Sequence, residues 1–154
     1  MKIVLATTNA GKVRELSDMM SKANLDITVC GLMDYPDYCA PEENGETFGE
    51  NARIKAVTAS ETLGEIVLAD DSGLCVDALG GAPGVRSARF AGNGHNDDAN
   101  IEKLLECMKD VPDGKRQARF VCSLCLAFPN GDFFVVEGDC PGTIARERRG
   151  TNGF

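Results

Sequence analysis

The stretch that most constrains the fold is an apolar run that leads directly into two adjacent carboxylates. Residues 66–69, Ile-Val-Leu-Ala, are followed by Asp70, Asp71, Ser72 and Gly73. This pattern predicts a buried strand that ends in a tight loop. Two neighbouring aspartates repel one another unless a positive group lies beside them, and divalent cations prefer carboxylate oxygens as ligands. The same residue types are common in solvated turns, so the stretch predicts either a metal site or a simple loop.

Composition limits the classes of function. The chain has 154 residues, enough for one domain with a proper core, and 16 basic against 24 acidic residues give a net charge of −8. Because no basic field surrounds such a chain, we expect neither a nucleic acid nor a membrane as partner. Its apolar stretches are far shorter than the ~20 residues that span a bilayer. Its seven cysteines, an odd number, predict free and mostly buried thiols in a reducing compartment. We therefore expect a cytoplasmic protein.

The N-terminal segment has the pattern strand, polar loop, amphipathic helix. Lys2 to Ala6 form an apolar strand, and apolar residues at 13, 16, 19 and 20 have helical spacing. The free N–H groups at a helix start favour an anion, whereas Thr8 or Asn9 could simply cap the helix. Capping explains one polar residue well but explains Lys12 less well, because its charge in the first turn opposes the helix dipole. The loop between strand and helix consists of Thr7, Thr8, Asn9, Ala10, Gly11 and Lys12.

The middle of the chain adds a second acidic pair and a second helix. A strand is predicted over residues 25–30, and an acidic loop over residues 34–46 contains Glu42 and Glu43. Thr47 and Glu50 have the spacing of a capping box, which predicts a helix from there to about Leu63, with Gly64 as its stop. Lys55 lies on this helix, either as a surface lysine or facing a phosphate.

The remainder predicts one helix and a hairpin. A helix capped by Asn96 or Asp97 is expected to reach Met108. Two strands, over residues 117–128 and 133–138, flank an Asn-Gly pair that is typical of a hairpin turn. From Asp139 onward we expect a turn that leads into the tail.

These features share one chemistry. Acidic clusters together with a phosphate-favouring loop are what metal-assisted attack of water on a phosphoanhydride requires. One carboxylate can orient or deprotonate the water, and lysines can stabilise charge on the leaving phosphate.

The combined motifs resemble those of the XTP/dITP diphosphatase family, the house-cleaning inosine triphosphatases. The matching segments follow one another in the family's order over essentially the whole chain. They are residues 7–12, Glu42-Glu43, Thr47-Phe48, Glu50-Asn51-Ala52, residues 69–74 (Ala-Asp-Asp-Ser-Gly-Leu), residues 79–84, Ser87 to Phe90, Ala118-Arg119-Phe120 and residues 150–154.

The resemblance implies an α/β fold with a curved mixed sheet and flanking helices, in two lobes around a central cleft, usually as a homodimer. It implies Mg²⁺-dependent hydrolysis of dITP, ITP and XTP to the monophosphate and pyrophosphate, which keeps these nucleotides out of DNA and RNA. Asp71 would be the general base. Glu43, with Glu42 as the other choice, and Asp71 would hold Mg²⁺. The implied substrate-binding residues are Thr7, Thr8, Asn9, Ala10, Gly11, Lys12, Lys55, Ser72 and, by stacking on the base, Phe154.

The family continues beyond the position of Phe154 into a segment that closes the base pocket. We therefore expect a single domain over residues 1–154 that is truncated at its C-terminus relative to the family. One alternative is a catalytically impaired nucleotide-binding fragment or assembly module, which would bind triphosphate without turnover. Another is a different phosphohydrolase that forms an aspartyl-phosphate, although no second phosphatase motif accompanies Asp70 and Asp71.

Overall fold

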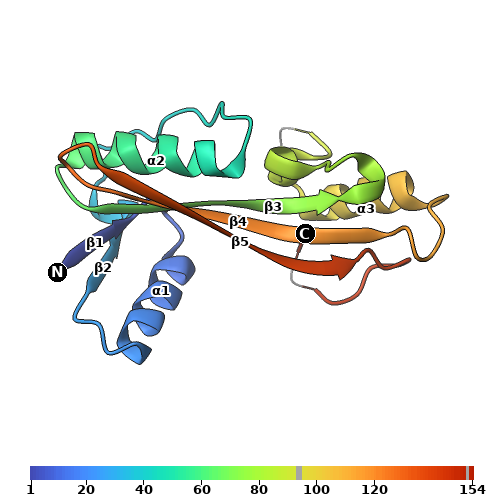
Figure 1. The fold of residues 1–154 in the computed structure, drawn as a ribbon, viewed down its shortest axis with the longest axis horizontal. Helices are drawn as coiled ribbons and strands as arrows, with labels where there is room; N and C mark the ends of the chain where they lie inside the picture. The colour runs from blue at the N-terminus through green and yellow to red at the C-terminus, as the bar shows by residue number, and fades with distance from the viewer. Residues whose placement is uncertain (93–94, 152) are drawn as a thin grey trace. The chain divides into compact units, whose positions relative to one another are not determined.

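The computed structural model describes residues 1–92, 95–151 and 153–154. In this part of the chain five strands form one sheet in the order β2-β1-β3-β4-β5 (Figure 1). β1 is parallel to both β2 and β3, and a tight turn joins β4 to β5, so that this last pair is antiparallel. The expected mixed α/β sheet is confirmed. Its strands are β1 (Lys2–Leu5), β2 (Thr28–Gly31), β3 (Val67–Val76), β4 (Gln117–Ala127) and β5 (Phe133–Thr143).

The helices begin and end where local signals place them. Thr47 accepts a hydrogen bond from the Glu50 N–H, and the Glu50 carboxylate accepts one from the Thr47 N–H, which confirms the capping box. Gly64 ends that helix in the left-handed conformation, at φ 66°, and Asn96 caps the last helix. The helices are α1 (Ala10–Lys22), α2 (Phe48–Leu63) and α3 (Asp97–Met108), with short 3₁₀ segments η1 (Leu32–Asp34), η2 (Asp77–Leu79) and η3 (Gly84–Arg89).

Two predictions about the ends of strands are wrong. β3 does not end before Asp70 but continues through Gly73 to Val76. β1 pairs with β3 only at Val67 and Leu68, but β4 lies on the other side of β3, and the local turn-forming residues do not reveal this strand neighbour. Likewise, β5 does not turn away at Asp139 but continues to Thr143.

The chain divides into two compact units, and β3, β4 and β5 each contribute residues to both. The first unit comprises residues 1–71 and 123–137. In it α1 and α2 lie on opposite faces of the sheet (Figure 1). Small alanines at helical spacing let α2 pack closely against the strands. The buried cluster consists of Val4, Ala52, Ala56, Ala59, Val67, Ala69, Cys125 and Ala127.

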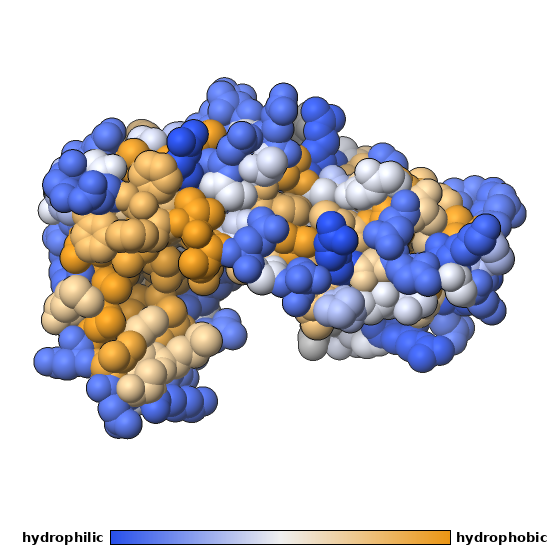
Figure 2. Space-filling model, viewed as in Figure 1, coloured by the Kyte–Doolittle hydropathy of each residue, from blue (hydrophilic) through white to orange (hydrophobic). Residues whose placement is uncertain are grey.

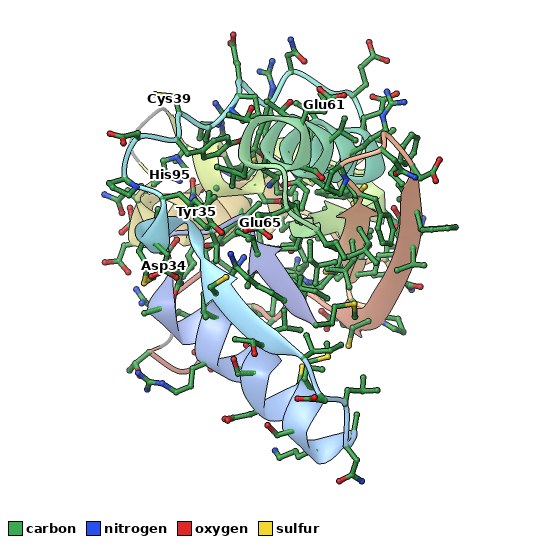
Figure 3. All side chains as sticks on the ribbon, turned by 90° about the vertical axis from the view of Figure 1, so that its left-hand side faces the viewer. Asp34, Tyr35, Cys39, Glu61, Glu65 and His95 are labelled. Carbon is green, nitrogen blue, oxygen red and sulfur yellow. The ribbon has the colours of Figure 1, made fainter. Side chains whose placement is uncertain are left out.

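A polar network ties the start of β1 to the segments around it. Lys2 Nζ lies 2.7 Å from the Tyr35 hydroxyl and 2.5 Å from Glu65 Oε1. The Tyr35 hydroxyl in turn donates to Glu65 Oε1 over 3.3 Å, and these two side chains lie together in Figure 3. The network lowers the pKa of Glu65, chiefly through the hydrogen bond from Lys2.

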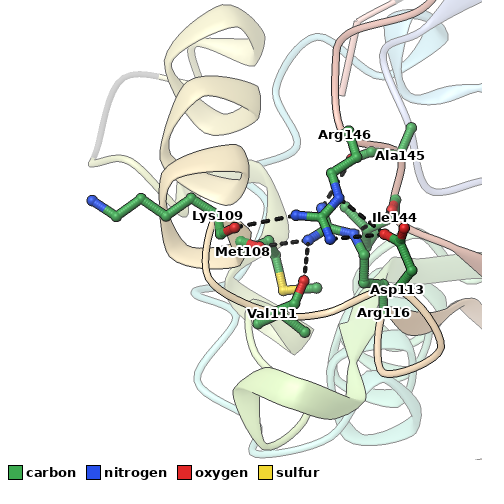
Figure 4. A network of polar contacts seen from close by, with 8 residues as sticks. All are labelled: Met108, Lys109, Val111, Asp113, Arg116, Ile144, Ala145 and Arg146. Atoms are coloured by element: carbon green, nitrogen blue, oxygen red, sulfur yellow. Dashed lines mark hydrogen bonds and ion pairs between the residues drawn. The ribbon is translucent and has the colours of Figure 1, made fainter.

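The second unit, residues 72–122 and 138–154, contains a buried arginine without a carboxylate partner among its described contacts. Arg116 is 3% exposed and donates to four backbone carbonyls (Figure 4). They belong to Val111 at 3.0 Å, Ile144 at 2.9 Å, Ala145 at 3.0 Å and Met108. Its guanidinium therefore joins the end of α3 to the segment that follows β5.

We expect Arg116→Met to lower the free energy of unfolding by about 3 kcal/mol or more, because buried carbonyls without a donor cost about 1–3 kcal/mol each. Arg119→Met, at an exposed position of β4, should change it by less than about 0.5 kcal/mol. Urea denaturation of both variants measures the difference. Equal stabilities would contradict this role for Arg116.

Cys30, Cys39, Cys107, Cys122, Cys125 and Cys140 are free thiols, as expected, but the prediction that most of the cysteines are buried is wrong. Only Cys125 among them is buried, whereas Cys39, Cys107, Cys122 and Cys140 are exposed. In the described part of the chain, no helix combines the length and apolar character needed to cross a membrane.

Candidate active site

The site begins with the alternation of side chains along β3. Val67 and Ala69 pack in the core with the alanines of α2, and Asp71 follows on the same face of the strand. There Asp71 Oδ2 accepts from Asn51 Nδ2 over 3.1 Å, and Oδ1 lies 3.5 Å from Lys55 Nζ. Asp70 points to the other face, where its carboxylate lies 2.7 Å from Lys12 Nζ of α1. The two aspartates therefore have separate lysine partners and do not form one carboxylate cluster.

The loop before α1 caps that helix, and the Lys12–Asp70 ion pair lies next to the cap. Asn9 Oδ1 accepts from the Gly11 N–H over 2.8 Å and from the Lys12 N–H over 3.3 Å. Thr7 Oγ1 accepts from the Asn9 N–H over 3.1 Å. The capping alternative is thus confirmed for Asn9, and Asp70 explains why a lysine stands in the first turn. Thr8, Ala10 and Gly11 are exposed alongside them.

The acidic loop reaches the same place from the other side. Glu43 Oε2 lies 3.1 Å from Lys55 Nζ, so the ammonium group contacts both Glu43 and Asp71. Lys55 and Asp71 are largely enclosed, with side chains 17% and 15% exposed. Glu42 is exposed. The structure therefore brings Glu43, Lys55 and Asp71 together.

The surroundings of Asp71 adjust its acidity. Burial raises the pKa of the Asp71 carboxyl above its ordinary value, because the charged form has lost water. The nearby Lys55 charge and the Asn51 hydrogen bond pull this pKa down, while the Glu43 charge pushes it up. A carboxylate with a raised pKa is a stronger base than one in water, which suits a group that accepts a proton.

The donors fit a magnesium ion shared with a ligand. Among the described residues no group of three or more His, Cys, Asp or Glu side chains surrounds a single point. Glu43 and Asp71 nevertheless contact the same ammonium group, so one cation is within reach of both. Mg²⁺ is commonly held by one or two carboxylates together with substrate phosphates and waters rather than by an all-protein cage.

Two expected substrate contacts belong to the second unit. Ser72, the next residue of β3, is exposed. Phe154 packs against the cluster of Leu74, Val76, Leu104, Met108 and Ala118, beside a cavity of about 220 Å³. Asn152, in the last of the matching motifs, lies outside the described residues.

Sequence reasoning overlooked Asn51 as a site residue. It is 3% exposed on α2, one helical turn before Lys55, and its side chain contacts Asp71. The i, i+4 spacing of Asn51 and Lys55 places them on one face of a helix. This spacing was the available signal in the sequence, but it does not reveal that Asp71 of β3 is the partner of Asn51.

The whole chain is similar to proteins of one known family. The profile of the Ham1 family matches residues 3–154. The chain belongs to the Ham1 family. A Ham1 relative from Bacillus cereus, named dITP/XTP pyrophosphatase, is 51% identical over 99% of this chain and 75% of its own length. A relative of the same name from Desulforamulus reducens is 49% identical, over 100% of this chain and 76% of its own.

Solved Ham1 structures share the fold. The HAM1 protein of Coxiella burnetii superimposes with a TM-score of 0.90 at 40% identity, covering 100% of this chain and 78% of the other. A dITP/XTP pyrophosphatase of Mycobacterium abscessus gives a TM-score of 0.87 at 42% identity, with the same coverage of both chains. The resemblance inferred from the sequence motifs is confirmed.

We expect Asp71→Asn to stabilise the protein near neutral pH. A carboxyl with a raised pKa contributes stability below its ordinary pKa of 3.8, and this contribution is lost as the pH rises through the folded value. The neutral amide of the variant does not titrate and so does not lose this stability. The variant should therefore be more stable than the parent above the folded pKa of Asp71, and the difference should vanish towards pH 3.

Thermal unfolding of both proteins across a pH series measures the effect. Asp18→Asn, at an exposed position of α1, is the matched control and should change little. An Asp71→Asn variant that is less stable than the parent at neutral pH would contradict the assignment of a raised pKa.

Proposed function

We propose that this Ham1 protein hydrolyses the non-standard purine nucleoside triphosphates dITP, ITP and XTP to the monophosphate and pyrophosphate. Such an activity keeps these nucleotides out of DNA and RNA. The names of the relatives from Bacillus cereus and Desulforamulus reducens support the substrate class. The observation that carries the reaction is the enclosed Asp71 carboxylate, of raised pKa, beside Lys55 and Asn51. Cytoplasmic nucleotide pools would supply the substrate, so we place the enzyme there.

The phosphates would bind to residues that already carry positive charge. Lys12 is 48% exposed and Lys55 17% exposed, and each now neutralises an aspartate. Either ammonium group can exchange that carboxylate for a phosphate oxygen. The loop before α1 and the first residues of that helix, exposed from Thr8 to Gly11, add backbone N–H groups, hydroxyls and the positive end of the helix dipole. Ser72 would contact the substrate, and Phe154 would stack on the base.

In the chemical step Asp71 would accept a proton from the water that attacks the α-phosphorus. The bond between the α- and β-phosphates breaks, and pyrophosphate leaves. Lys12 and Lys55 would stabilise the negative charge that develops on it. Glu43 and Asp71 would hold Mg²⁺, which supplies neutralisation of phosphate charge and polarisation of the phosphorus when bound.

Pyrophosphate release from dITP, ITP and XTP in the presence of Mg²⁺ tests this proposal. Asp71→Asn should lower kcat by about 10²–10⁴-fold, the range typical of a lost general base. Glu43→Gln should raise the Mg²⁺ concentration needed for half-maximal rate, while its neighbour Glu42→Gln should not. Triphosphate binding by calorimetry without turnover would instead identify the chain as a nucleotide-binding module.

A covalent phosphoaspartate would identify the other alternative. It would be detected by mass spectrometry after rapid quenching in acid. The proposed mechanism forms no such species, because water attacks the substrate directly.

We also propose that the protein forms a homodimer through the edge strand β5. The sheet order leaves β5 with one strand neighbour, and Phe134 and Val136 are 65% and 61% exposed. Figure 2 shows apolar residues gathered over this part of the first unit. An open edge with apolar side chains is complementary to an identical antiparallel strand, which makes a two-fold symmetric contact the simplest partner.

Replacing both Phe134 and Val136 by Glu should convert the dimer to a monomer, because four carboxylates would face each other across the two-fold axis. The matched control is Leu25→Glu, which alters another apolar side chain that is 50% exposed. Sedimentation velocity at micromolar concentration measures the mass. A parent protein that sediments as a monomer would contradict this interface.

A further inference from the structure

Asn51 connects the acidic loop to the carboxylate of Asp71. Its Nδ2 donates to Asp71 Oδ2 over 3.1 Å, and its Oδ1 accepts from the Gly45 N–H over 2.8 Å. An ionised carboxylate can only accept and a backbone N–H can only donate, so the bridge needs a side chain that both donates and accepts. The Asn51 amide does both, through two separate atoms. At 3% exposure water has little access to replace it.

The loop is pressed against α2 at this point. A Cβ atom on Gly45 would lie 2.7 Å from Asn51 Oδ1 and 2.8 Å from Glu50 Cβ, so only glycine fits. Gly45 follows Glu43 by two residues, which means that the bond to Asn51 also limits where Glu43 lies. Asn51 is not needed as a cap, since Thr47 and Glu50 already perform that role.

Asn51 and Lys55 therefore form two parallel bridges from one face of α2. Asn51 links Gly45 to Asp71, and Lys55 links Glu43 to Asp71. The two bridges differ in their response to a bound phosphate. A phosphate attracts the charged Lys55 ammonium away from its carboxylates, whereas the Asn51 amide is neutral and is attracted far less.

We infer that Asn51 is a positioning residue that holds Asp71 Oδ2, so that Oδ1 is the oxygen left for the reaction once Lys55 engages phosphate. This role rests on the proposed hydrolysis and deepens it. It assigns different duties to the two oxygens of one carboxylate. It also makes the acidic loop and the general base a single unit that is assembled before the substrate arrives.

Two substitutions separate the halves of the bridge. Asn51→Asp keeps an acceptor for the Gly45 N–H but replaces the donor to Asp71 by a carboxylate oxygen, which repels that side chain. Asn51→Ala removes both. The matched control is Ser60→Ala, which deletes a buried hydrogen bond from the same helix, to the Glu65 carbonyl, and contacts no site residue.

The measurements are kcat and KM for dITP and the hydrogen-exchange rate of the Gly45 amide, all on the full chain. Asn51→Asp should lower kcat about 10²-fold, the cost of a misplaced catalytic group, with KM changed less than threefold. Its Gly45 amide should stay protected, while that of Asn51→Ala exchanges faster. Ser60→Ala should keep the parent kcat.

Normal kcat in Asn51→Asp, a loss confined to KM, or an equal loss in Ser60→Ala would overturn the positioning role. Equal Gly45 exchange in Asn51→Asp and Asn51→Ala would overturn the bridge to the loop. A parent chain that releases no pyrophosphate would overturn the proposed function and this role with it. An active parent with a fully active Asn51→Asp variant would overturn the role of Asn51 alone.

Discussion

The alternation of side chains along β3 is the constraint on which the site depends. Successive residues of a strand point to opposite faces, so Asp70 meets Lys12 of α1 while Asp71 meets Lys55 of α2. Two like charges that are adjacent in the chain are thus kept apart by backbone geometry, and each is neutralised by its own lysine. The arrangement works only because both faces of the first unit's sheet carry a helix, as Figure 1 shows.

The same geometry links stability to function. Val67 and Ala69 are buried against α2, and the face that buries them also buries most of Asp71. Burial raises the pKa of this carboxyl, which costs stability when it is charged and increases its basicity. Lys55 and Asn51 moderate that cost without removing it, whereas the Glu43 charge adds to it. A largely buried carboxylate with a raised pKa lowers stability at neutral pH, and such groups are typical of functional sites.

The second unit contains a buried positive charge. Arg116 is a buried cation, and its described partners are backbone carbonyls rather than a carboxylate. Carbonyl dipoles at the end of α3 and after β5 satisfy the guanidinium donors in a fixed planar pattern. The result is a junction just before the segment that leads to Phe154, whose partly exposed ring packs against the core of this unit.

Local signals in the sequence were enough to predict several elements: the capping box at Thr47 and Glu50, the stop at Gly64, the cap at Asn96 and the turn between β4 and β5. The sequence also identified the family, because the motifs follow one another along the chain. Tertiary structure alone decided what depends on partners from distant segments. Turn-forming residues did not end β3 at Asp70, because β4 lies beside it in the sheet and can supply its backbone with hydrogen-bonding partners. Asn51 and Arg116 look like ordinary polar residues in sequence. Their roles arise from Asp71, Gly45 and the carbonyls of Met108 and Ile144, which only the folded chain brings to them.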